Sequence, residues 1–292
     1  MLLIPDDATL RRFIPNTFAK TFPEQESLYD KMLPRLTAAE LWLTENIIPH
    51  EILHRLVDEA LSTEDPLYFV PRSIVALKAW ADAIPSLDVV VSDSGISTVE
   101  TNTLRPASKA KIDRLIESSQ RQLDAAIAML PKLLMEVPGW WQTPQAEPFR
   151  RTLFHDYTIL TQIKDSPKGP VSEPPGETCR TVHDRFLSIL PRIEAIEDEL
   201  AQYWVSAPIM RRLRETKGQT HAETKLRELV RTAIIATANG AGPQEKKQMC
   251  RRLTDHILTH AGDFPQWRGT STAALFSVPA YRNRPGSTAH WL

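Results

Sequence analysis

The sequence predicts a mainly α-helical protein made of two related helical units, with one β-hairpin inserted in the first unit. Apolar residues recur at helical spacing along most of the chain. A segment in the first half matches a segment in the second half without gaps, which is typical of a tandem duplication. One stretch in the first half instead places two β-branched runs around a turn signal, and the second half has no counterpart to it.

The helices of the first half follow from apolar periodicity and from helix-start residues. Leu36, Ala39 and Leu43 fall on one helical face. Pro34 suits a first helical turn, where its missing N–H costs nothing, and Ser108 is a typical N-cap residue. Helices are therefore predicted, in chain order, over residues 6–12, 24–32, 34–48, 50–61, 71–84 and 108–130.

The β-hairpin is predicted near residues 87–101. Two runs rich in β-branched residues are separated there by a short turn that ends in Gly95, which tolerates a positive φ. Exposed strand edges readily pair with other chains. Four hairpin residues are therefore candidate interface residues: Val90, Val91, Gly95 and Ile96.

Residues 164–178 are rich in proline and glycine, which predicts a linker or a long surface loop. This places the first unit at residues 1–163 and the second at residues 179–292. Residues 149–163 fit a strand or a helix. In the second unit, helices are predicted over 179–205, 208–215, 221–239 and 243–261, followed by an irregular C-terminal tail.

The internal repeat is clearest where residues 31–56 lie over residues 188–213. Nine of the 26 aligned residues are identical, whereas average amino-acid usage gives roughly 1–2 by chance. With gaps, residues 72–83 resemble residues 227–238. Further along, Trp141 pairs with Trp267 and Phe149 with Phe276. A duplicated helical unit is more typical of a scaffold or an assembly protein than of a single catalytic centre.

Composition disfavours several functional classes. The chain carries 35 basic and 36 acidic residues, so it lacks the basic surplus of a dedicated nucleic-acid binder. Cys179 and Cys250 are too few for a disulfide framework and suit free thiols in a reducing cytoplasm. No apolar stretch is long enough to span a membrane, so no membrane contact is expected. Phosphate-binding glycine loops and nucleophile motifs are missing, and no cofactor is expected.

One motif could carry chemistry, the His50-Glu51-Ile52-Leu53-His54 segment. It matches the HExxH pattern, in which two imidazoles one helical turn apart bind zinc and the glutamate acts as general base. Here a proline precedes the first histidine, an arginine follows the second, and no recognisable third ligand comes after them. An exposed helix start is the favoured interpretation, and a zinc site of His50, Glu51 and His54 is the alternative.

Basic residues cluster on two predicted helices of the second unit. Solvated helix faces are the favoured interpretation, and contact with a nucleic-acid backbone or an acidic partner is the alternative. The predicted basic patch comprises Arg211, Arg212, Arg214, Lys246 and Lys247.

Three tryptophans in irregular segments, Trp140, Trp141 and Trp267, are further candidate interface residues. Aromatic side chains are enriched at binding hot spots. Closure of the core between helices explains these tryptophans equally well at this point.

The stretch from Gly95 to Leu115 resembles a pattern in an uncharacterised, prophage-encoded protein family. A glycine-led strand precedes Asn102, and Pro106-Ala107-Ser108-Lys109 then opens a long helix. Residues 33–56 are also similar to the N-terminal part of that family. The resemblance implies a phage-particle role, loosely like that of helical head–tail connector or head-completion proteins, which sit as rings under the portal.

Three functional hypotheses follow, and the first is preferred. The chain is a non-enzymatic virion or prophage structural protein, which binds copies of itself and other particle proteins such as portal or tail components. The second hypothesis is a zinc hydrolase, and the third is a cytoplasmic adaptor that binds nucleic acid through its arginine-rich helices. Under the first hypothesis, the protein is cytoplasmic in the producing cell and then part of the virion.

Overall fold

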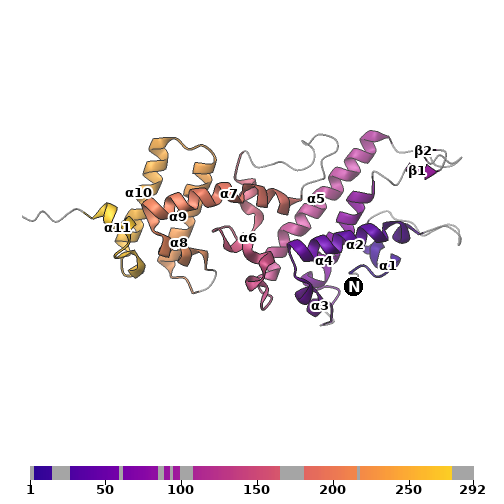
Figure 1. Cartoon of the computed structure of the whole chain (residues 1–292), viewed down its shortest axis with the longest axis horizontal. Helices are drawn as coiled ribbons and strands as arrows, with labels where there is room; N and C mark the ends of the chain where they lie inside the picture. Colours follow the sequence, from indigo (N-terminus) through magenta and orange to yellow (C-terminus); the bar gives the residue numbers. More distant parts are fainter. Residues whose placement is uncertain are drawn as a thin grey trace, which may run out of the picture. The chain divides into compact units, whose positions relative to one another are not determined.

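The computed structural model describes residues 3–14, 27–58, 62–84, 89–92, 95–98, 108–164, 181–215 and 218–277. The chain divides into two compact units, Met1–Pro191 and Arg192–Leu292. Helices dominate both units, as the sequence predicts (Figure 1). Among the described residues, no helix combines the length and the apolarity that a membrane crossing needs.

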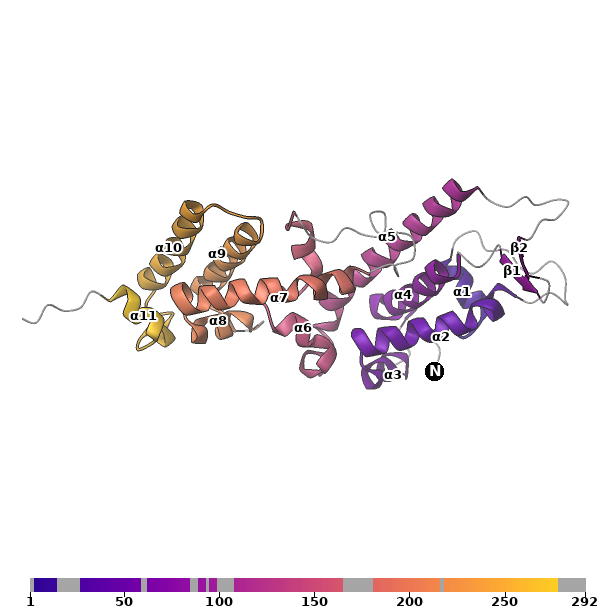
Figure 2. The same cartoon turned by 45° about the horizontal axis from the view of Figure 1, so that its top comes forward.

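Unit 1 is built on three long helices, of which α4 lies against both α2 and α5 (Figure 1 and Figure 2). Its helices are α1 (Asp7–Phe13), α2 (Leu28–Asn46), α3 (His50–Asp58), α4 (Pro66–Ala83) and α5 (Lys109–Leu134). Short elements follow, namely η2 (Trp140–Gln142), η3 (Pro144–Ala146), α6 (Glu147–Arg150), η4 (Tyr157–Thr161) and the first half of α7 (Val182–Leu200).

The central position of α4 follows from its composition. Its buried residues lie on all sides of the helix and include Val70, Ile74, Val75 and Leu77, which is typical of a helix that packs against several neighbours. The helix begins earlier than residue 71, the predicted start. Asp65 accepts a hydrogen bond from the Leu67 amide, and a proline occupies the first turn, so both signals start the helix at Pro66.

Two short antiparallel strands, β1 (Val89–Ser92) and β2 (Gly95–Thr98), lie within the segment predicted as a hairpin. Val89 pairs with Thr98, and Ser92 pairs with Gly95. The side chains of Val90, Val91 and Ile96 lie outside the described part of the structure. The interface role predicted for these residues and for Gly95 therefore stays a prediction.

Unit 2 contains the second half of α7 and a compact set of helices after it. These elements are η6 (Ala201–Val205), α8 (Ala207–Arg214), α9 (His221–Ala238), α10 (Pro243–Thr259), η7 (Pro265–Trp267) and α11 (Ser271–Phe276). The five residues of η6 form a π-helical turn at the end of α7. The predicted irregular tail thus contains two short ordered elements, η7 and α11.

The division between the units differs from the sequence prediction, because it falls at Pro191 inside α7. The start of α7 is attached to unit 1 by Asp124 on α5. The Asp124 carboxylate accepts from the Val182 amide at 2.8 Å and pairs with Arg185 at 2.9 Å. A carboxylate at the first turn satisfies a free amide and opposes the positive end of the helix dipole. The predicted linker, residues 164–178, lies outside the described residues except for Lys164.

A buried ion pair joins α7 to α8 within unit 2. The Glu197 side chain is fully buried, and the Arg214 guanidinium lies 2.8 Å from its carboxylate. Removing one partner of a buried ion pair is costly, because the remaining buried charge loses part of its compensation.

We expect Arg214→Met to lower the free energy of unfolding by about 3 kcal/mol, because it removes the guanidinium that pairs with the buried Glu197 carboxylate. Denaturant titration of the full chain measures this loss. Arg211→Met, on the exposed face of the same helix, is the matched control and should change stability by less than about 0.5 kcal/mol. Equal losses in the two variants would contradict a structural role for the pair.

Candidate functional site

Unit 1 contains an aromatic cluster centred on Phe149 of α6. The Phe149 ring stacks on Phe186 of α7, with centroids 5.3 Å apart and planes 15° apart. Tyr157 meets both rings edge-on, and Trp140 lies 6.0 Å from Phe149. These side chains are buried and close the end of unit 1.

Trp140 is a core residue, which corrects its predicted interface role. Its ring is fully buried, and its indole N–H donates to the Ile47 carbonyl at 2.8 Å. A buried indole needs such a partner, and this one lies just beyond the end of α2. Trp267 is likewise buried in unit 2. Trp141 is half-buried and meets the His155 ring edge-on at 5.2 Å.

A similar arrangement occurs in unit 2 around Trp267. The ring centroids of Trp267 and Phe276 are 6.1 Å apart, and the ring planes are inclined at 39°. The same two values for Trp140 and Phe149 are 6.0 Å and 43°. The Thr270 hydroxyl donates to the Trp267 carbonyl, as the Thr143 hydroxyl does to the Trp140 carbonyl. The contacts of Trp267 in unit 2 thus resemble those of Trp140 in unit 1, whereas the sequence comparison paired Trp267 with Trp141.

The two clusters differ in exposure. Phe149 is fully buried, whereas Phe276 is 36% exposed and its neighbour Leu275 is 63% exposed. Phe276 contacts the Trp204 and Trp267 rings. We call Leu275 and Phe276 the α11 surface. Large apolar side chains that lie together on a surface are typical of protein–protein contact sites.

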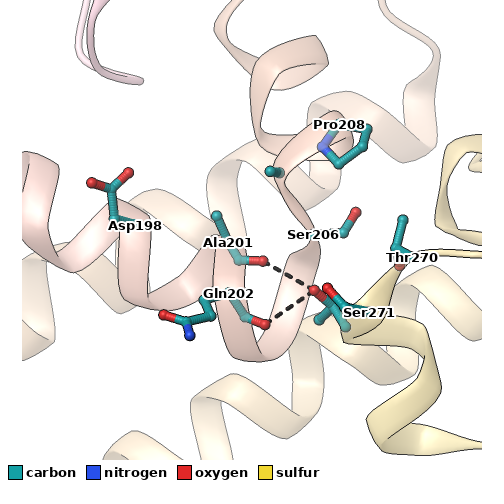
Figure 3. A pocket seen from close by; sticks show the side chains of 9 residues that line it. Asp198, Ala201, Gln202, Ser206, Pro208, Thr270 and Ser271 are labelled. Carbon is teal, nitrogen blue, oxygen red and sulfur yellow. Dashed lines mark hydrogen bonds between the residues drawn. The ribbon is translucent and has the colours of Figure 1, made fainter.

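A pocket of about 500 Å³ lies beside the π-helical turn of unit 2 (Figure 3). The Thr272 hydroxyl bridges the carbonyls of Ala201 and Gln202, which fixes α11 against the turn. Ser206 has φ 80° and ψ 145°, a conformation that non-glycine residues seldom adopt. The pocket is lined by Asp198, Ala201, Gln202, Ser206, Ala207, Pro208, Thr270, Ser271 and Thr272.

The HExxH segment lies at the start of α3. His50 and Glu51 are exposed and His54 is half-buried, and the two imidazole rings are 4.3 Å apart at an angle of 61°. Within the described ranges, no three histidine, cysteine or acidic side chains converge as a metal site requires. The structure thus brings the two histidines together without a third ligand from the described residues.

The predicted basic patch is largely neutralised by local acids. Arg212 pairs with Glu223 and Glu215, Arg214 with Glu197, and Lys246 with Glu199. Arg211 and Lys247 are exposed. Three of the five cations already pair with carboxylates. The positive electrostatic potential of this surface, which would attract a phosphate backbone, is therefore reduced.

A buried Tyr157–His183 pair was not anticipated from the sequence. The Tyr157 hydroxyl lies 2.9 Å from His183 Nδ1. Burial lowers the pKa of His183 to about 4, because the imidazolium form loses its hydration there. His183 also meets the Trp42 ring edge-on, which connects α2 with the start of α7.

Comparison with known proteins gives one match. Residues 19–150 match a protein family described as a family of unknown function (DUF6712). The match ends at the last residue of α6 and covers less than half of the chain. No curated protein and no solved structure matches the chain significantly.

We expect the stability of the chain to fall as the pH drops from 6.5 to 4. His183 is neutral in the folded chain over this range, whereas the unfolded chain takes up a proton. His183→Gln, which keeps an acceptor for Tyr157, should reduce this fall by about 3 kcal/mol. Denaturant titrations at several pH values measure it. The free energies of unfolding of the two proteins should vary with pH in parallel above pH 6.5. Curves that stay parallel down to pH 4 would contradict the assignment of the pH dependence to His183.

Proposed function

We propose that the chain is a non-enzymatic structural protein of a prophage-encoded particle, which acts by self-association and by docking to other particle proteins. The observation that carries this proposal is the α11 surface, where Leu275 and Phe276 leave unit 2 with an apolar end. Its counterpart in unit 1 is covered by aromatic packing. The particle assignment, including a head–tail connector or head-completion role, rests on the resemblance of the segment from Gly95 to Leu115 to a prophage-encoded family.

We further propose that the chain arose by tandem duplication of one module, α2–α6, repeated as α7–α11, so that the second module begins with the part of α7 that packs in unit 1. The aligned helices have matching burial at most positions of residues 32–58 and 189–215. Eight pairs of hydrophobic residues are buried in both: Met32/Ile189, Leu36/Ile193, Ala39/Ile196, Leu43/Leu200, Ile48/Val205, Ile52/Ile209, Leu53/Met210 and Leu56/Leu213.

Polar positions support the same alignment. Glu40 and Glu197 occupy equivalent positions of the alignment, and Glu40 is half-buried where Glu197 is fully buried. Burial raises the pKa of Glu40, whose carboxylate accepts from the Leu3 amide. The ordered series of helices and the Trp–Thr–Phe arrangement add to this support. The family match also ends where the first module ends.

A duplicated module suits an assembly protein for a physical reason. Stacked modules bury their apolar faces against their neighbours, so the terminal modules keep a face without a neighbour. Such a face either carries polar residues or serves as a contact surface. The α11 surface is apolar, which favours the second role.

The two alternatives each retain one supporting observation. For a zinc hydrolase, it is the proximity of the His50 and His54 rings. For nucleic-acid binding, it is the exposure of Arg211 and Lys247. Neither observation favours its function over the structural proposal.

Quantitative proteomics of purified particles tests the proposal. We expect DNA-filled particles, induced from cells that encode the chain, to contain several copies of it per particle relative to the major capsid protein. An abundant host cytoplasmic protein, quantified in the same preparation, controls for carry-over. Particles that assemble without the chain would overturn the proposal.

A further inference from the structure

We propose that the α11 surface of one copy binds the start of α2 in a second copy, so that copies associate head to tail. This inference rests on the proposed self-association and names its two contact surfaces. The second surface comprises Tyr29 and Leu33, and we call it the α2 surface.

The packing of Phe149 in unit 1 provides the pattern for this contact. Phe149 ends the first module, and it is covered by Phe186 from the start of α7. Leu190, one turn further along α7, is buried as well. The Phe149 ring is thus covered by an aromatic side chain from the first turns of α7, and a buried leucine follows one turn further along the same helix.

The α11 surface is the equivalent end of the second module. Phe276 has the same ring geometry toward Trp267 that Phe149 has toward Trp140. No described side chain stacks on Phe276 as Phe186 stacks on Phe149, and Phe276 and Leu275 remain exposed. The surface therefore lacks, within the described residues, the partner that its counterpart has.

The α2 surface supplies side chains of the matching kind. The alignment of residues 31–56 with 188–213, extended by one turn, places Tyr29 over Phe186 and Leu33 over Leu190. Tyr29 and Leu33 are only half-buried, whereas Phe186 and Leu190 are buried. The Tyr29 hydroxyl bonds to the carbonyls of Ile4 and Pro5, which orients its ring.

A contact between two different surfaces is heterologous. Each copy keeps one free surface after the first contact, so association continues until a ring closes or a filament forms. A two-fold symmetric dimer would instead join identical surfaces and stop at two copies. The proposed contact thus predicts how association grows as well as where it occurs.

The first test compares association of the full chain and of the double variant Leu275→Asp/Phe276→Asp by analytical ultracentrifugation over a concentration series. We expect the variant to associate at least roughly 30-fold more weakly, the effect typical of a central interface residue. Leu41→Asp is the matched control, because Leu41 is exposed and Asp198 occupies the equivalent position in the second module. It should associate like the unmodified chain.

The second test mixes two variants, Leu275→Asp/Phe276→Asp and Leu33→Glu. Each lacks one surface and keeps the other, so each alone should be monomeric and the mixture should form a one-to-one complex that grows no further. Matching thermal unfolding midpoints check that both variants fold. If Leu33→Glu fails to fold, disulfide formation between Leu33→Cys and Leu275→Cys chains, with Cys179→Ser in both, replaces it.

The outcomes separate this inference from the proposed function. Association that is insensitive to the α11 variant, or a mixture that stays monomeric, would overturn the head-to-tail contact. In that case particle proteomics would still decide the structural role. A chain that is monomeric at all concentrations would overturn the contact as well.

Discussion

The indole of Trp140 is the interaction on which unit 1 depends. Its N–H donates to a carbonyl just beyond the end of α2, and its ring lies against Phe149. This single side chain therefore connects the end of α2 to α6. Through Phe149 it also supports the ring stack that receives the start of α7. Trp267 has the matching contact with Phe276 in unit 2.

Electrostatic contacts then fix how the helices begin. Asp124 reaches from α5 to the first turn of α7, and Ser27 and Asp30 form a capping box at the start of α2. In unit 2, the fully buried Glu197 binds Arg214 across two helices. These contacts satisfy groups that would otherwise be costly to bury, so they specify which helix ends meet.

The features of this chain that support a function lie on its surface and not in a cavity. The HExxH histidines lie close together at an exposed helix start, and most of the predicted basic patch faces acidic residues of the same unit. The pocket beside the π-helical turn is open, and its lining combines one carboxylate with neutral polar and small apolar residues. Among the exposed apolar side chains of the described residues, Leu275 and Phe276 are neighbours on α11, and Leu275 has the largest exposed fraction.

The sequence by itself determined the helical class and most helices, because apolar periodicity, caps and prolines act over a few residues. It also predicts an internal repeat, which remains a proposal, through identities such as Leu43/Leu200 and Arg55/Arg212. Only the tertiary structure decided which aromatics are core and which are surface. Trp140 and Trp141 are neighbours in sequence, yet one is buried and the other half-exposed. The Tyr157–His183 contact, the start of α4 at Pro66 and the division at Pro191 also required the structure. Local sequence patterns specify these contacts and helix caps only weakly. Whether a side chain is buried depends on the residues that pack against it, and these come from distant parts of the sequence.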